Sequence, residues 1–386
     1  MDKLIESQVI KCPVCKSDSF ESVYAKDFNV YMDNVGLVWP TNQVVCKRCG
    51  MIYTNPQPTE KVLERYYNSY SRYGDSFKLF KFREAQVEFF KRHILSTSKT
   101  VLEIGAFDGS LLHFLRELGV DVHGIEPSEE GVKNALKNYG ISLERAFFDD
   151  AYVKEFLDNG REKFDVVLFL NVFEHVSDPV GFLKLVLQIT RDEGVIFIEV
   201  PDAQRPLVEN VADFFSIEHI MYYTESSLKN IASVLGLEIP VIERPADTHI
   251  IRVLFKKTGH KEKKLTFINE FEKNKKVIED YKDRRNKFIN GLKSKVDGIE
   301  NIIIYGAGMH TSQVLGEGLL DNINVEGIVD SDPKKWGGNL WGYIIKSPDF
   351  LKQTNTPVLI SSYPAQEEIS NFLTHKYPHI KQIKLY

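Results

Sequence analysis

All four cysteines of the chain fall into two CxxC pairs, which are Cys12 with Cys15 and Cys46 with Cys49. Each pair places two thiolates on one tight turn, and two such turns can close around a tetrahedral Zn²⁺ ion. Two disulfides are the competing interpretation, but they require an oxidising compartment that no other feature of the sequence indicates. Because four thiolates leave no ligand position open, we expect a structural zinc site that folds residues 10–52 and has no catalytic role.

A second group of residues predicts a binding site for a methyl donor. The segment VLEIGAFDG carries Glu103 at the end of a predicted strand, followed by Gly105 and Gly109. Glycine lets the backbone approach a ligand closely. Dinucleotide-binding turns space their glycines as GxGxxG to hold a pyrophosphate, and this turn does not. The ExGxxxG spacing favours a ligand without phosphates that carries an amino acid and a nucleoside, such as S-adenosylmethionine.

Three further residues are predicted to bind the same donor. Glu126 ends the next predicted strand, where a carboxylate can accept both ribose hydroxyls. Asp149, after Phe148, can hydrogen-bond the adenine, although it can equally be a surface acid. Asn171, in the predicted strand at 164–172, completes the donor set.

Two acid–histidine pairs are candidates for acid–base chemistry. Glu218 and His219 lie in SIEHIMYYT, close to Tyr222, and His175 follows Glu174 after the predicted strand at 164–172. A histidine among apolar residues is more often a core residue than a catalyst. However, its ordinary pKa near neutrality suits it to general-base work, and a tyrosine hydroxyl can donate to a developing oxyanion. We expect His175 to line the substrate mouth, or else to satisfy backbone groups at a strand end.

A second glycine turn lies in YGAGMHTSQ. It carries Gly306 and Gly308, and Asp330 ends the following predicted strand. Residues 296–386 suffice for one mononucleotide-binding half but not for a complete dinucleotide domain with a substrate domain. These three residues are therefore predicted to bind the nucleotide part of a substrate, unless the glycines serve only packing.

The elements that must position these residues alternate between strands and helices. Strands are predicted at 100–105, 120–126, 164–172 and 194–200, with antiparallel edge strands in LEIPVIE and IIRVLFKK. This is the pattern of an α/β fold with a Rossmann-like sheet, flanked by a small zinc-binding module and a C-terminal Rossmann-like α/β domain. The predicted divisions are a zinc module at 1–58, a helical connector at 59–98, a methyltransferase domain at 99–258, an amphipathic linker helix at 259–295 and a C-terminal nucleotide-binding-like domain at 296–386.

The composition is that of a globular enzyme. The 386 residues are 43% hydrophobic and 27% charged, and the net charge of -5 gives no basic footprint for nucleic acid. No apolar run is long enough for a membrane helix, and the first residues lack the features of a signal peptide. We therefore expect a cytoplasmic protein, monomeric or a small homo-oligomer, that binds neither nucleic acid nor membranes.

Taken in order along the chain, the motifs resemble the three-part sugar C-methyltransferases. The resemblance rests on CPVC with CKRC, VLEIGAFDG, IEVPDAQRP, SIEHIMYYT, and IYGAGM with VDSDPKKWGG. It implies a zinc-binding module, a class I methyltransferase domain and a C-terminal α/β domain. It further implies methylation, by S-adenosylmethionine, of a carbon beside a ketone in a nucleotide-linked deoxysugar.

The resemblance also implies roles for the SIEHIMYYT segment. The family's segment reads much like YHEHLSYF and supplies the acid–base groups; Glu218, His219 and Tyr222 match its second half, whereas Ser216 and Ile217 replace its tyrosine and first histidine. On this reading His219 is the base. Two alternatives stay open: oxygen methylation of a sugar hydroxyl, and an inactive nucleotide-binding scaffold.

Overall fold

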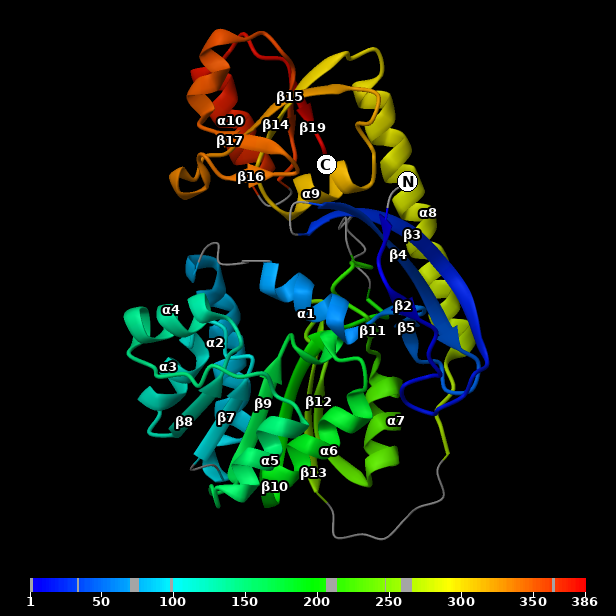
Figure 1. Ribbon diagram of the computed structural model, residues 1–386, viewed down its shortest axis with the longest axis vertical. Coiled ribbons are helices and arrows are strands. Elements are labelled where there is room, and N and C mark those ends of the chain that lie inside the picture. The colour runs from blue at the N-terminus through cyan, green and yellow to red at the C-terminus, as the bar shows by residue number, and fades with distance from the viewer. Residues whose placement is uncertain are drawn as a thin grey trace.

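The computed structural model describes residues 3–32, 35–69, 76–97, 100–205, 214–246, 248–257, 266–362 and 365–386. Three parts follow one another along the chain (Figure 1). An N-terminal sheet and a larger α/β unit lie side by side, and a second α/β unit caps one end of the molecule. The α/β architecture predicted from the sequence is confirmed. Parts of the predicted connector and linker, residues 70–75 and 259–265, lie outside the described residues.

The N-terminal part is a long antiparallel hairpin with short strands along it. Strand β4 pairs with β3, β1 and β5, and β2 pairs with β6. The elements are β1 Lys3–Leu4, β2 Ser7–Gln8, β3 Phe20–Met32, β4 Val35–Cys46, β5 Ile52–Thr54, β6 Gln57–Pro58, α1 Glu60–Ser69, α2 Ser76–His93 and η1 Leu95–Thr97. The sheet does not end with the module, because β11 of the next part pairs with β5.

The central unit has the strand order β12-β13-β10-β9-β7-β8. Strands β7 to β10 are mutually parallel, and β13 and β12 complete the sheet as the antiparallel edge that the sequence predicts. Its elements are β7 Thr100–Ile104, α3 Ser110–Glu117, β8 Asp121–Ile125, α4 Glu129–Tyr139, α5 Asp150–Asp158, β9 Phe164–Leu170, η2 Phe173–His175, α6 Pro179–Ile189, β10 Thr190–Pro201, β11 Met221–Tyr222, α7 Glu225–Leu235, β12 Leu237–Glu243 and β13 Ile250–Lys257.

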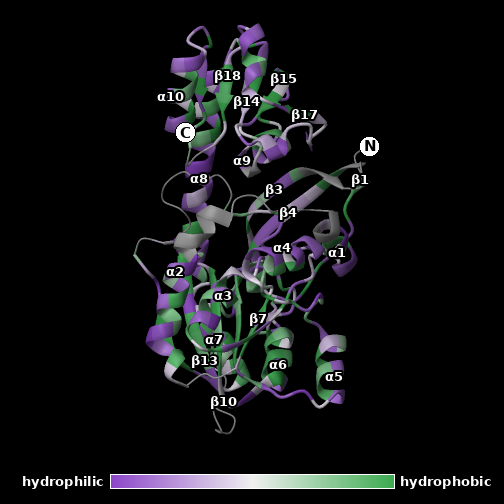
Figure 2. Cartoon of the chain, turned by 90° about the vertical axis from the view of Figure 1, so that its left-hand side faces the viewer, coloured by the Kyte–Doolittle hydropathy of each residue, from purple (hydrophilic) through white to green (hydrophobic). Residues whose placement is uncertain are grey.

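Hydrophobic burial on both faces holds this sheet. Its strands read as nearly continuous apolar runs, as expected for parallel strands covered by helices. One face shares a single core with the N-terminal part, in which Trp39 and Tyr53 join Phe169 and Tyr223. Hydrophobic residues concentrate in the strands and on the inner helix faces, and hydrophilic residues gather outside (Figure 2). The N-terminal module and the central unit therefore fold around a common interior.

The C-terminal unit repeats the α/β pattern on a smaller scale, with the strand order β16-β17-β15-β14-β18-β19. Helix α8, which is the predicted amphipathic linker, leads into it along the β3–β4 hairpin (Figure 1). The elements are α8 Phe271–Val296, β14 Asn301–Tyr305, α9 Met309–Gly316, β15 Asn324–Val329, η3 Pro333–Lys335, β16 Asn339–Leu340, β17 Tyr343–Lys346, η4 Pro348–Gln353, β18 Val358–Ile360, α10 Gln366–Lys376 and β19 Gln382–Lys384.

A buried ion-pair cluster joins the C-terminal unit to the rest of the chain. The Glu317 carboxylate, at the end of α9, accepts two hydrogen bonds from Arg285 of α8, at 2.6 and 2.7 Å, and pairs with Lys26 of β3. Arg285 and Glu317 are almost fully buried. Removing one partner would leave a buried charge uncompensated, so the cluster fixes how the hairpin, α8 and α9 pack.

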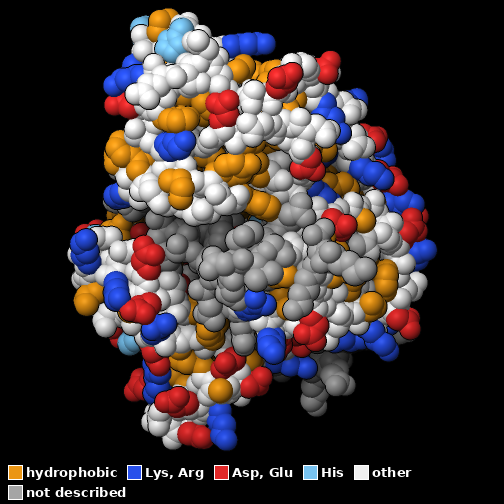
Figure 3. All heavy atoms as spheres, turned by 45° about the horizontal axis from the view of Figure 1, so that its top comes forward, with side chains coloured by type: hydrophobic (Ala, Val, Ile, Leu, Met, Phe, Trp, Pro, Cys, Tyr) orange, Lys and Arg blue, Asp and Glu red, His pale blue; other side chains and the backbone are white. Residues whose placement is uncertain are grey.

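One face of the molecule carries charged side chains of both signs. Acidic and basic side chains are interspersed on the face drawn in Figure 3. Among the helices of the described residues, none is long and apolar enough to cross a membrane.

Candidate functional site

The four cysteines converge on one point, as their spacing predicts. Cys12 Sγ lies 3.6 Å from Cys49 Sγ, Cys15 Sγ lies 3.5 Å from Cys46 Sγ, and all four residues are buried free thiols. A tetrahedron of thiolates around Zn²⁺, with Zn–S bonds of about 2.3 Å, has edges of about 3.8 Å. Hydrogen bonds with Cys12 first, and then with Cys49, lower the pKa of Cys46 to about 7, while Cys15 and burial oppose that shift. The donor set and its spacing therefore fit a structural zinc ion, and disulfides are absent.

Each cysteine pair sits on the same kind of turn. The N–H of Lys16 donates to the carbonyl of Cys12, and the N–H of Gly50 donates to that of Cys46, both at 2.9 Å. Lys16 and Gly50 both have positive φ, 57° and 71°. A Cβ on Gly50 would lie 2.9 Å from the backbone nitrogen of Glu270, so glycine is required where this turn packs against the start of α8.

The predicted donor turn contains a buried carboxylate, one oxygen of which has no hydrogen-bond partner in the described part of the chain. Glu103 is 1% exposed, and its Oε2 has no hydrogen-bond partner among the described residues. Burial raises the pKa of Glu103 to about 8, with Arg83 opposing the shift and Asp108 and Glu126 adding to it. A buried acid of this kind is satisfied by a cationic ligand. The α-amino group of S-adenosylmethionine is such a cation, so the residues present fit the donor.

Arg83 was not anticipated from the sequence. It is buried on α2, where its Nε donates to Ser110 Oγ at 3.1 Å, and its charge opposes the rise that burial causes in the pKa of Glu103. A buried chain continues from it, because Arg83 donates to Gln86, Gln86 donates to Glu199, and Glu199 pairs with Arg252 at 2.6 Å. Arg252 lies in β13 and Glu199 in the neighbouring strand β10, so this ion pair links two strands of the sheet. Only the tertiary fold brings α2 to the donor turn.

The two glycines of the donor turn are required by close contacts. Gly105 and Gly109 have φ of 71° and 72°, in the left-handed region. A Cβ on Gly105 would lie 2.7 Å from Val172 Cγ2, and one on Gly109 would lie 2.9 Å from Ala135 Cβ. The donor turn therefore packs directly against the loop that follows β9, which contains Val172 and His175.

The remaining predicted donor residues take defined positions. Glu126 is buried at the end of β8, and its two oxygens accept the N–H groups of Phe107 and Ser128, each at 2.9 Å. Asp149 caps α5 by accepting the N–H of Tyr152 at 2.8 Å, which gives it a local structural role. Asn171 has φ of 55°, and its N–H donates to the carbonyl of Glu199. Their contacts to a donor stay predictions.

The two acid–histidine pairs meet at the carboxyl edge of the sheet. His175 and His219 have ring centroids 5.0 Å apart, and Nε2 of His219 lies 3.9 Å from Oε1 of buried Glu174. Nδ1 of His175 lies 2.9 Å from the carbonyl oxygen of Glu218. A carbonyl can only accept, so Nδ1 carries the proton and Nε2 of a neutral His175 is an acceptor. Glu174, His175 and His219 also form a donor set that could hold a divalent cation.

Glu218 and Tyr222 lie on the same segment but face other groups. Glu218 is buried and accepts a hydrogen bond from the hydroxyl of Tyr66, on α1, at 2.8 Å. Tyr222 is buried against Phe214 and Phe215, and its hydroxyl donates to the carbonyl of Ser216 at 3.4 Å. Burial raises the pKa of Tyr222, so it retains its proton. These contacts join Glu218 to α1, which no sequence signal indicated, and Tyr222 to an aromatic cluster.

The second glycine turn carries a compensated acid. Asp330 accepts the N–H groups of Ala307, at 2.6 Å, and Asp332, at 2.8 Å, and Lys335 Nζ lies 3.1 Å from its Oδ2. Gly306 has φ of 112°, and a Cβ on Gly308 would meet no atom within 4 Å. The structure thus brings the three predicted residues together at the ends of β14 and β15, while a bound nucleotide stays a prediction.

Comparison with known families assigns the central unit. Residues 79–240 match a family model described as "Methyltransferase domain". These residues form a class I methyltransferase domain. The match begins within α2, before the first strand of the sheet, so the helix that carries Arg83 is part of the methyltransferase domain. Residues 298–380 match a second family model, described as "C2185-like, N-terminal", which covers the C-terminal unit.

Two relatives of the methyltransferase domain differ in the atom that their names give as the acceptor. The ubiquinone biosynthesis O-methyltransferase of Caulobacter vibrioides is 32% identical over 99 residues, which cover 26% of this chain and 39% of the relative. The C-methyltransferase NovU of Streptomyces niveus is 26% identical over 215 residues, which cover 55% of this chain and 50% of the relative. The chain therefore spans half or less of the length of either relative.

A solved structure of similar fold is an S-adenosylmethionine-dependent methyltransferase from Archaeoglobus fulgidus. It is 19% identical, and the match covers 47% of this chain and all of that one with a TM-score of 0.37. A likeness at this level identifies neither substrate nor acceptor.

Proposed function

We propose that the protein transfers a methyl group from S-adenosylmethionine to a carbon beside the ketone of a nucleotide-linked deoxysugar. The main support for the proposal is that Gly105 of the donor turn packs against Val172, which lies three residues before His175. A histidine pair therefore lies next to the predicted donor site. Of the two relatives described above, the C-methyltransferase has the longer match, which supports carbon as the acceptor.

His219 is the proposed base. Carbon beside a ketone attacks only after it loses a proton, and an imidazole titrating near neutral pH can accept that proton. Glu174 lies 3.9 Å from Nε2 of His219 and can offset the charge of the protonated ring, which leaves Nδ1 as the accepting atom. Base–carboxylate distances are commonly longer in the free enzyme than in the complex. The bound donor supplies the electrophilic methyl group.

The sugar hydroxyls are proposed to bind three side chains, those of His175, Glu218 and Tyr66. The hydrogen bond to the Glu218 carbonyl fixes the tautomer of His175, so its Nε2 can accept a sugar hydroxyl. Tyr66 and Glu218 are hydrogen-bonded to each other and can exchange that bond for hydroxyls of the substrate. Tyr222 stays a proposed hydrogen-bond donor to the enolate oxygen, because its hydroxyl keeps its proton. To act in this way, the hydroxyl would have to break its hydrogen bond to the carbonyl of Ser216.

The C-terminal unit is the proposed site for the nucleotide. Asp330 and the turn at Gly306 and Gly308 lie at the ends of parallel strands, the edge at which such sheets bind ligands. Lys335, which pairs with Asp330, could turn to a phosphate group.

Mass spectrometry of reaction products tests the proposal. The purified protein is incubated with methyl-labelled S-adenosylmethionine and a panel of nucleotide-linked sugars, half of them keto sugars. We expect label on carbon in keto sugars only. The variant His219→Asn should bind the donor normally and lose turnover, and His123→Asn, an exposed histidine of the same domain, is the matched control. Near wild-type turnover in His219→Asn would remove that residue from the mechanism.

Oxygen methylation of a sugar hydroxyl is the second candidate. Two observations favour it: the similarity to O-methyltransferases, and the presence of Ser216 and Ile217 where the sugar C-methyltransferases have a tyrosine and a histidine. It needs the same donor site and one base but no ketone. Label on the oxygen of hydroxy sugars would establish it, and failure to bind S-adenosylmethionine would favour an inactive scaffold instead.

A further inference from the structure

The second cysteine turn is held by asparagines from distant parts of the chain. Asn230 of α7 donates to the carbonyl of Cys49 at 3.3 Å, Asn269 donates to that of Lys47 at 2.9 Å, and Asn274 of α8 donates to that of Gly50 at 2.7 Å. Asn230 and Asn274 are almost completely buried. The turn is therefore fixed to the methyltransferase domain and to α8 by directed contacts as well as by packing.

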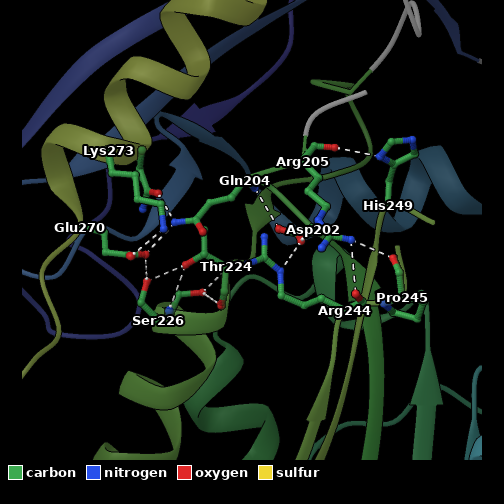
Figure 4. A network of polar contacts seen from close by, with 12 residues as sticks. Asp202, Gln204, Arg205, Thr224, Ser226, Arg244, Pro245, His249, Glu270 and Lys273 are labelled. Atoms are coloured by element: carbon green, nitrogen blue, oxygen red, sulfur yellow. Dashed lines mark hydrogen bonds and ion pairs between the residues drawn. The ribbon is translucent and has the colours of Figure 1, made fainter. Parts of the chain in front are cut away.

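One of these contacts continues to the end of β10. Oδ1 of Asn274 accepts a hydrogen bond from Nε2 of Gln204 at 2.9 Å, and the same nitrogen lies 2.6 Å from Oε2 of Glu270. The backbone N–H of Gln204 donates to buried Asp202, as Figure 4 shows. Asn274 thus connects the cysteine turn to the point where the segment 202–222 leaves the sheet.

A second connection reaches the other end of that segment. Strand β5 begins three residues after Cys49 and pairs with β11, and the N–H of Thr54 donates to the carbonyl of Ile220 at 2.9 Å. The N–H of Ile220 in turn donates to the carbonyl of Glu174 at 3.0 Å. The residue next to His219 is therefore hydrogen-bonded on one side to the cysteine module and on the other to the Glu174–His175 loop.

We propose that the thiolate metal site positions His219, by fixing both ends of the segment 202–222 through Asn274 and β5. The inference rests on the proposed function in so far as His219 is the base. The metal touches no substrate in this arrangement. The four cysteines would hold the ion, and a ligand set folded around a metal loses its geometry without it. A bound metal would therefore set the shape of the turn, and the turn sets where the histidine lies. A base displaced by about 1 Å can lose about 100-fold in rate.

The test compares Asn274→Ala with Asn269→Ala. Both variants lose one hydrogen bond to the cysteine turn, but among the described contacts Asn269 reaches only Lys47 and the start of α8. For Asn274→Ala we expect one metal ion per chain and donor affinity within about twofold of wild type. We also expect amide hydrogen exchange in residues 214–222 to be at least about fivefold faster. Turnover should fall about tenfold at unchanged KM for the donor. Asn269→Ala should resemble wild type.

Hydrogen exchange separates this inference from the proposed chemistry, since it needs no substrate. Faster exchange in 214–222 with no methyl transfer in any sample would support the positioning and refute the proposed function. Unchanged exchange in Asn274→Ala with intact metal content would overturn the positioning. The full-length protein treated with a zinc chelator is the second measurement, used if Asn274→Ala does not fold. Unchanged exchange in 214–222 after complete metal loss would also overturn the positioning.

Discussion

Two glycine turns of the chain follow parallel strands of two different sheets, and the acids beside them are bound in the same way. Glu126 accepts the N–H of Phe107 and that of Ser128, two residues after itself. Asp330 accepts the N–H of Ala307 and that of Asp332, again two residues after itself. In both units a carboxylate at the end of the second strand ties the first turn to the sheet.

The two turns differ in whether their buried acids are compensated by a neighbouring group. At the end of β7 stands Glu103, buried and with one oxygen lacking a partner among the described residues, whereas the matching position of β14 is the apolar Ile304. Asp330 is offset by Lys335, whose Nζ lies 3.1 Å from its Oδ2. A shared backbone geometry therefore does not imply a shared ligand. The first turn leaves a buried acid with which a cationic ligand group can pair, while the acid of the second turn is already paired with a lysine.

The largest expected effect comes from exchanging the glycines of the two turns for alanine. Gly109→Ala adds a side chain in the left-handed region and 2.9 Å from Ala135 Cβ, so it should lower the free energy of unfolding by about 2–4 kcal/mol. Gly308→Ala points into open space and should change it by less than about 0.5 kcal/mol. Urea denaturation checks both. Equal effects would show that the two turns do not differ in packing.

The second-largest expected effect is on donor affinity, and it tests the role of Glu103. Glu103→Gln removes the charge that faces the donor's ammonium group and should weaken donor binding by about 10- to 100-fold, the value of a hydrogen bond to a charged group. Asp330→Asn, the control on the other sheet, should leave donor affinity unchanged. Isothermal calorimetry measures both affinities, and a normal affinity in Glu103→Gln would contradict the proposed role of the acid.

The smallest expected effect is the change of donor affinity with pH. Burial raises the pKa of Glu103 to about 8, so the acid is largely neutral in the free protein at pH 7. Binding an ammonium group should ionise it and release a proton, so donor affinity should rise by up to about tenfold per pH unit between about pH 6 and about pH 7.5. The raised pKa also makes folding most favourable at low pH, and this contribution is lost progressively as the pH rises from about 4.5, where the unfolded chain ionises, to about 8. Calorimetry in buffers of different ionisation enthalpy detects the proton, and Glu103→Gln should release none.

The sequence predicted the features that depend on local pattern. The cysteine spacing predicted the four-thiol cluster, and apolar runs predicted the strands of the central sheet, including its antiparallel edge. Strand β10 begins at Thr190, earlier than the predicted 194, because its register shifts between Thr190 and Val195. Such irregularities follow from pairing with neighbours, which a single strand's pattern does not contain.

The features that the sequence did not predict depend on contacts between distant residues. Arg83 reaches the donor turn only because α2 packs against the sheet, and Tyr66 meets Glu218 across 152 positions of the chain. Nothing in either local sequence marks them. The predicted metal-folded unit, residues 10–52, is likewise less separate than its motif indicates, because β5 pairs with β11 and three asparagines bind the second turn.

Hydrogen–deuterium exchange at the substrate carbon tests the central claim most directly. The protein is mixed in deuterium oxide with a nucleotide-linked keto sugar and S-adenosylhomocysteine, which fills the donor site but has no methyl group to give. If His219 forms the enolate, the carbon beside the ketone should take up deuterium in the wild type and not in His219→Asn. No exchange in the wild-type protein, with label from S-adenosylmethionine found on sugar oxygen, would contradict carbon methylation.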